Sequence, residues 1–224
     1  MLARCYGIAT SAQDFQTRNG QYLSSEWHAL LRGYLRAFTC PVINHLRPEL
    51  WYRPHLLVTD LIGFVPGIQF KLPRSMVTTR IDDARVFFKA CGNRLRYSPL
   101  TLPSNYLLDL EENLEKLETL SSLVPLFLSE VIPGVTVDAF VVGPDVIFDP
   151  PDGNAAAVGR HCVDIATRLG VTFCALRFVK NAGGEWYCLG LDLMPALYEC
   201  ADEVRTAVVG HLANALVSAN GAHR

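Results

Sequence analysis

Residues 126–142 read LFLSEVIPGVTVDAFVV, and residues 171–193 read VTFCALRFVKNAGGEWYCLGLDL. In both segments, runs of β-branched and aromatic residues are interrupted by residues that favour turns. The Asn-Ala-Gly-Gly sequence at 181–184 predicts a β-hairpin whose strands are Val171–Val179 and Glu185–Leu193. Further strands are expected at Leu126–Val131, Val135–Val142 and Val146–Phe148.

Helices are predicted around these strands. Ala155–Leu169 carries its apolar residues at helical spacing and is followed by Gly170, a residue that commonly ends a helix. The other helices are expected at Ser24–Phe38, from Arg53-Pro54 to Leu61, after an N-cap at Asp82 or Asp83, at Asp109–Ser122 and at Asp202–Ser218. Short strands are expected at Met76–Thr79 and Leu95–Tyr97. This mixed order predicts an α+β fold with antiparallel sheets.

The composition narrows the possible functions. The chain has 224 residues, half of them hydrophobic, and a formal net charge of −2. It has no basic excess that would neutralise a phosphate backbone, so we expect no nucleic-acid partner. No apolar run approaches the roughly 20 residues that cross a bilayer, and the first residues do not have the pattern of a signal peptide. We therefore expect no membrane partner.

The seven cysteines are scattered, and no two of them have the Cys-x-x-Cys spacing of a zinc or redox site. Several lie in apolar segments, such as Cys174 and Cys188, where we expect buried, reduced thiols. Reduced thiols favour a cytoplasmic location.

An acidic loop has two interpretations. Asp145, Asp149 and Asp152 lie among prolines and glycines, as they would in a calcium or magnesium loop. They could equally bond the local backbone within a turn, which we favour.

The second half of the chain resembles a known family. Leu126–Gly134 is similar to the hinge strand of the ATP-grasp ligases, and Val137–Gly143 to the strand that follows it. Leu169–Phe178 and Asp192–Pro195 resemble the two strands that carry that family's magnesium ligands. The four segments occur in the family's order.

The resemblance extends toward the N-terminus. Ser25–Leu31 with Val42–Asn44 is similar to the family's linker region, and Arg53–Leu57 to the helix after it. Leu72–Thr78 and Arg96–Leu100 resemble the next two motifs. The most similar branch contains the ribosomal-protein glutamate ligases and the graspetide macrocyclases, which join a carboxylate to an amine or a hydroxyl at the expense of ATP.

This resemblance implies an ATP-grasp-like fold of two α+β lobes with antiparallel sheets and a reduced N-terminal domain. Residues 1–80 would be the remnant of the pre-grasp and linker region. Residues 81–224 would form the ATP-grasp-like domain, with lobes at about 81–125 and 126–224.

The resemblance also implies that most of the nucleotide site has changed. Phosphoryl transfer requires cations on the phosphates and oxygen ligands on magnesium. Ser98 stands at the position of the phosphate lysine, Asp138 at that of the strand arginine, and Arg177 at that of the first magnesium aspartate. Met194 replaces the magnesium asparagine with a thioether, which suits magnesium poorly. Only Asp192, at the position of the second acidic magnesium ligand, keeps a carboxylate.

Other residues could retain or replace the lost functions. Glu130 stands at the hinge acid, and Arg96 lies two residues before Ser98, on the same strand face, where it could supply a phosphate cation. Asp138 and Arg177 carry exchanged charges and could pair with each other across neighbouring strands.

Three functions therefore remain. The leading hypothesis is a degenerate ATP-grasp protein, a pseudoenzyme without cofactor that acts as a scaffold or regulatory partner of a peptide ligase. The second is an active ATP-dependent carboxylate–amine ligase that uses ATP and magnesium through an altered site. The third is a module that binds a peptide or a carboxylate. A protein partner or a homodimer, and a peptide, are the expected partners.

Overall fold

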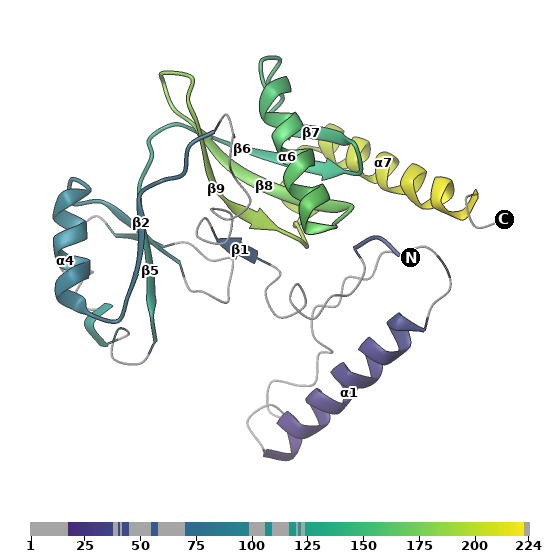
Figure 1. Cartoon of the computed structure of the whole chain (residues 1–224), viewed down its shortest axis with the longest axis horizontal. Helices are drawn as coiled ribbons and strands as arrows, with labels where there is room; N and C mark the ends of the chain where they lie inside the picture. Colours follow the sequence, from purple (N-terminus) through teal and green to yellow (C-terminus); the bar gives the residue numbers. More distant parts are fainter. Residues whose placement is uncertain are drawn as a thin grey trace.

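The protein is represented by a computed structural model that describes residues 18–37, 40, 42–44, 55–57, 70–98, 106–108, 117–119, 121 and 124–221. Within these residues, two antiparallel sheets and their helices confirm the predicted α+β fold (Figure 1). None of the helices described is both long and apolar enough to cross a bilayer.

The larger sheet has five strands in the order β1-β9-β8-β6-β7. They span β1 His55–Leu57, β6 Val135–Val142, β7 Asp145–Asp149, β8 Phe173–Lys180 and β9 Trp186–Asp192. The predicted hairpin is confirmed as β8 and β9, and its turn places Gly184 at a φ of 77°. Glycine adopts this left-handed conformation without the steric strain that a side chain would add.

Two helices cover opposite faces of this sheet because successive strand residues point to opposite sides. Helix α6 (Ala156–Leu169) packs on the face formed by Val137, Ala139 and Leu176. Helix α7 (Asp202–Gly221) packs on the face formed by Phe140 and Phe173. The predicted end of α6 is confirmed, since Gly170 closes it at a φ of 63°.

The smaller sheet has four strands in the order β2-β5-β3-β4. They span β2 Ser75–Thr78, β3 Leu95–Ser98, β4 Tyr106–Leu108 and β5 Leu126–Glu130. Helix α4 (Ile81–Ala90) covers one face, where Ala84 and Phe88 pack against Leu95 and Leu126. The strand predictions at Met76–Thr79 and Leu95–Tyr97 are confirmed.

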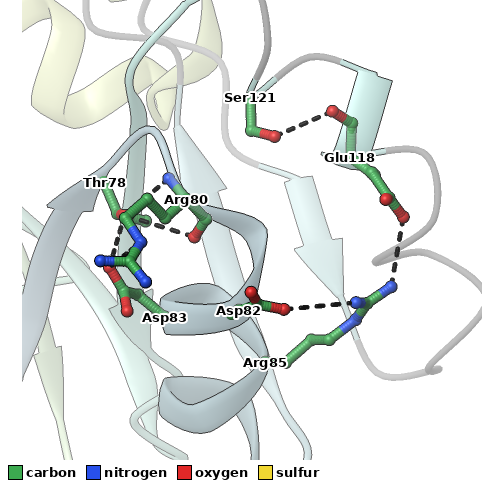
Figure 2. Close-up of polar contacts among 7 residues, drawn as sticks. All are labelled: Thr78, Arg80, Asp82, Asp83, Arg85, Glu118 and Ser121. Carbon is green, nitrogen blue, oxygen red and sulfur yellow. Dashed lines mark hydrogen bonds and ion pairs between the residues drawn. The ribbon is translucent and has the colours of Figure 1, made fainter.

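The start of α4 differs from the prediction. Its N-cap is Arg80, while Asp82 and Asp83 lie inside the first turn. The turn that leads into the helix is made by Thr78, whose hydroxyl accepts the Arg80 backbone N–H at 2.9 Å (Figure 2). A side-chain oxygen therefore does turn the chain here, but it comes from the end of β2.

A second prediction was wrong at β1. The helix expected from Arg53-Pro54 to Leu61 is not present over His55–Leu57, which pair antiparallel with Asp192–Gly190 of β9. The open edge of β9 supplied hydrogen-bond partners that a local sequence pattern cannot reveal. Most of the helix expected at Asp109–Ser122 lies outside the described residues.

Helix α1 (Arg18–Arg36) begins before the predicted Ser24 and lies apart from both sheets (Figure 1). Five of its large apolar side chains are more than half exposed: Tyr22 63%, Leu23 54%, Trp27 51%, Leu30 62% and Tyr34 64%. These five residues are called the α1 apolar set below.

Within the described residues, the chain crosses between the two sheets twice. Lys71 bonds to β9, because its backbone N–H donates to Trp186 and its carbonyl accepts the Cys188 N–H, and the chain then enters β2. It returns after Glu130, so β5 belongs to the smaller sheet through its pairing with β2 and β3. The boundaries predicted at residues 80 and 125 stay predictions.

Candidate functional site

Three charged residues singled out from the sequence lie on one face of the larger sheet. Asp138 of β6 is directly opposite Arg177 of β8, and Asp192 of β9 is opposite Ala175. Residues that are opposite in an antiparallel pair, or two apart along a strand, point to the same side. The side chains of Asp138, Arg177 and Asp192 therefore project from the face that α7 partly covers.

Asp138 and Arg177 form a two-point ion pair. Arg177 Nε donates to Asp138 Oδ1 at 2.8 Å, and its Nη2 donates to Oδ2 at 2.9 Å. The Asp138 side chain is 24% exposed and that of Arg177 is 48% exposed. The hydrogen bond to Asp138 raises the pKa of Arg177, against the opposing effect of burial. The predicted cross-strand pairing is confirmed.

Arg177 lies among further carboxylates. Besides Asp138, it is attracted by Glu199 and Asp192, both of which raise its pKa. Glu199 belongs to the short 3-10 helix η3 (Leu197–Glu199). Asp192 Oδ1 accepts the Met194 backbone N–H at 2.7 Å, as in an Asx turn. The guanidinium thus provides the positive charge that several acids on this face share.

Arg96 and Ser98 project from the smaller sheet. Arg96, on the inner strand β3, is half-buried, whereas Ser98 is buried, with 4% of its surface exposed. Burial lowers the pKa of Arg96, and repulsion by Arg177 lowers it further.

Glu130 is held at the end of β5 by Arg74. Arg74 Nε donates to Glu130 Oε2 at 2.6 Å, and the Arg74 backbone N–H donates to Oε1 at 2.9 Å. The Glu130 N–H in turn donates to the Arg74 carbonyl at 2.9 Å. We call this arrangement the Arg74–Glu130 clamp. Its contacts tie the two chain crossings together.

The acidic loop follows the turn interpretation at Asp152, whereas Asp145 and Asp149 contact α7 and the residue before it. Asp152 accepts the Asn154 backbone N–H at 2.9 Å and pairs with Lys180. Asp149 accepts the Ala201 backbone N–H at 3.2 Å, and Asp145 lies 2.9 Å from His211 Nδ1. These carboxylates serve separate partners, and no three acidic, histidine or cysteine side chains of the described residues gather as metal ligands.

Sequence reasoning missed the role of Asn44. Its Oδ1 accepts the backbone N–H groups of Thr172 and Phe173, both at 2.9 Å. Its Nδ2 donates to the carbonyls of Phe173 at 2.5 Å and Leu193 at 3.4 Å. The side chain therefore joins the segment before β8 to the end of β9, next to Asp192. The sequence signal that could have indicated this role is the position of Asn44 in the Val42–Asn44 motif.

The structure is similar to several solved ATP-grasp enzymes. The ATP-grasp ligase PsnB, complexed with a minimal precursor, matches with a TM-score of 0.73 and 18% identity over 97% of this chain and 77% of that chain. The macrocyclase MdnC, bound with the precursor peptide MdnA from Microcystis aeruginosa MRC, matches with a TM-score of 0.70 and 10% identity over 92% and 73%.

A third structure extends the comparison. The RiPP-associated ATP-grasp ligase of Chryseobacterium gregarium, in complex with ADP and a leader and core peptide, has a TM-score of 0.70 and 16% identity over 96% of this chain and 74% of that chain. No protein-family profile matches the sequence, and no curated protein does. The structural agreement spans nearly the whole chain and confirms the fold that the sequence resemblance implied: the chain has the ATP-grasp fold.

Proposed function

We propose that this chain is a non-catalytic ATP-grasp-fold protein that binds a peptide or a protein partner beside an active peptide ligase. The observation that supports it most is the ion pair of Arg177 with Asp138. By the sequence resemblance, these positions would need the opposite charges to hold magnesium and phosphate. We propose a cytoplasmic location, because the scattered cysteines are typical of reduced thiols.

The residues on this face are a poor match for magnesium and a nucleotide. Two unit charges 4 Å apart interact by about 4 kcal/mol at an effective dielectric constant of about 20. Taken alone, Arg177 would repel a divalent cation and Asp138 a phosphate by energies of this order, but within the ion pair the two charges largely offset each other. The mismatch therefore lies in the residue types: the pair presents a guanidinium where the resemblance implies a magnesium carboxylate, and a carboxylate where it implies a phosphate cation. The acids beside Arg177 already have a cation among them.

The peptide part of the proposal rests on similarity. PsnB, MdnC and the Chryseobacterium ligase were each solved with a precursor, leader or core peptide. A chain with the same fold that has lost the nucleotide chemistry can still bind a peptide, because peptide contacts do not depend on magnesium.

Calorimetry with Mg-ATP tests this proposal. We expect the wild-type chain to bind no tighter than about 1 mM, which corresponds to about −4 kcal/mol. The exchanged variant Asp138→Arg/Arg177→Asp keeps an ion pair but returns the signs that the resemblance implies, so we expect it to bind Mg-ATP more tightly. Micromolar binding by the wild type would reject the proposal and favour a carboxylate–amine ligase with an altered site.

The ligase alternative has its own supporting observation. Arg96 provides a cation on β3, two residues before Ser98, and Asp192 keeps a carboxylate on the same sheet face as Arg177. If the chain were a ligase, sustained conversion of ATP to ADP and phosphate would require both a carboxylate, which takes the phosphoryl group, and an amine, which displaces it. We expect no such release.

A further inference from the structure

We propose that helix α1 pairs with the α1 helix of a second copy of this chain, in antiparallel orientation and through a seam of four residues. All four belong to the α1 apolar set and are more than half exposed: Leu23, Trp27, Leu30 and Tyr34. The inference goes beyond the proposed function, because α1 lies apart from the larger sheet, to which that function is assigned (Figure 1).

Helix α1 needs a surface to pack against. It has 19 residues, and every residue between Tyr22 and Tyr34 whose side chain the structure describes is exposed, except the half-buried Leu31. Gly33, in its interior, weakens a helix. Isolated helices are marginally stable in water, and most helices in proteins are stabilised by packing an apolar face. A second protein surface is therefore expected to cover the apolar side of α1.

The spacing of the seam indicates that the partner is a helix. Its four residues follow one another at intervals of four, three and four positions, from Leu23 to Tyr34. This is the heptad pattern, in which apolar side chains recur about every 3.5 positions and insert between the side chains of a second helix. A strand or an irregular loop does not present gaps with this repeat.

The seam is complementary to itself when the two helices run in opposite directions. If Trp27 faces Leu30 of the partner subunit, then Leu23 faces Tyr34 of the partner subunit, and a two-fold axis repeats both contacts. Each layer then combines an aromatic ring with a leucine, so the layers have similar volumes. Parallel helices would place ring on ring and leucine on leucine, and would align the two helix dipoles unfavourably. The antiparallel pair is therefore favoured.

The area of the seam determines how strong this association can be. The exposed parts of the four side chains amount to on the order of 400 Å² per copy. A standard stable interface uses about 800 Å² per partner, and smaller ones are typical of transient complexes. We therefore expect a reversible dimer with a dissociation constant on the order of 10 µM.

A charge-exchange experiment on the full chain, followed by sedimentation velocity, tests the antiparallel pairing. Leu30→Glu and Trp27→Lys should each weaken dimerisation at least about ten-fold, because each variant alone buries a charge against an apolar residue. An equimolar mixture of the two variants should recover the dimer. In the mixed pair the introduced carboxylate faces the introduced ammonium, and the second Trp27–Leu30 layer is unchanged. The control Val86→Glu, at an exposed position on α4, should dimerise like the wild type.

A second measurement uses the unmodified chain, so it does not depend on the variants being folded. Amide hydrogen exchange in α1 should slow as the wild-type concentration rises from about 1 µM to about 100 µM, because pairing protects the helix. Exchange that does not change with concentration would overturn the inference, as would a mixture of folded variants that stays monomeric. Binding of a monomeric wild type to phosphatidylglycerol vesicles would also overturn it, in favour of a membrane surface. None of these outcomes alters the Mg-ATP result, so the proposed function is tested separately.

Discussion

Asn44 has a left-handed backbone, with a φ of 57°, and uses both ends of its side-chain amide. We expect Asn44→Ala to lower the free energy of unfolding by about 1–3 kcal/mol, because backbone groups of Thr172 and Phe173 lose their partners. Asn44→Gly keeps the left-handed backbone accessible and should cost less. Urea denaturation measures both variants. Equal loss in both would mean that backbone strain contributes nothing.

The carboxyl group of Asp152 makes the free energy of unfolding depend on pH. The hydrogen bond from Lys180, followed by the one from the Asn154 N–H, lowers the pKa of its carboxyl group. A lowered pKa contributes stability above the unfolded value of about 3.9, and this contribution is lost as the pH falls through the folded pKa. We expect Asp152→Asn to flatten the acid limb of the stability curve, measured by denaturation between about pH 2 and pH 6.

The control for this prediction is Asp164→Asn, which changes an exposed carboxylate on α6. Its acid limb should follow that of the wild type. If both variants flatten the curve equally, general charge repulsion, and not the pair with Lys180, accounts for the acid sensitivity.

Some residue roles could be predicted and others could not. The pairing of Asp138 with Arg177 follows from two adjacent strands whose charges alternate with buried residues, and this pattern is visible in the sequence. The Asn44 side chain bonds to Thr172 and Leu193, which are 128 and 149 residues further along the chain, so no local sequence pattern contains these contacts. Arg74 is tied to Glu130 in the same non-local way.

Replacing two different glycines by alanine should change the stability of the fold in opposite directions. A Cβ on Gly134, before β6, would lie 2.2 Å from the Lys180 carbonyl oxygen, whereas one on Gly210, within α7, would meet nothing within 4 Å. We expect Gly134→Ala to destabilise the fold by about 1–3 kcal/mol through overpacking. Gly210→Ala should stabilise it by about 0.5–1 kcal/mol, because alanine favours the helix. Thermal denaturation of both variants measures the difference, and stabilisation by Gly134→Ala would show that the two strands separate readily.

The elements that could be predicted are those with strong local patterns. The β8–β9 hairpin carries its turn in its own sequence, and α6 carries its apolar face and terminal glycine. Strand β1 has only three residues and exists through its pairing with β9. Its leucines suited a helix equally well, so tertiary context decided between the two.

At the scale of the whole molecule, the α1 apolar set is exposed on a helix that lies apart from both sheets (Figure 1). An exposed apolar surface of this kind usually marks a site of contact with another protein surface. We expect sedimentation at roughly tens of micromolar to show a dimer, or affinity capture to recover a ligase partner, and Leu30→Glu or Tyr34→Glu to dissociate the assembly.

Val209→Glu, an exposed apolar position on α7, is the matched control and should leave the assembly intact. A monomer with no recovered partner would contradict the prediction. Loss of circular dichroism in Leu30→Glu would assign the helix face to the chain's own core, which also contradicts it.

The Arg74–Glu130 clamp has a mechanical consequence. The first residue of β2 and the last residue of β5 lie at the same end of the smaller sheet. The two described crossings between the sheets therefore run side by side, and backbone and side-chain hydrogen bonds join them. Two strips of backbone joined along their length behave as a ribbon, which bends readily across its thin direction but resists shearing in its own plane. The two sheets should therefore move relative to each other mainly by a hinge rotation about these crossings. Arg96 lies in the smaller sheet and Arg177 in the larger one, so such a rotation would change the distance between them.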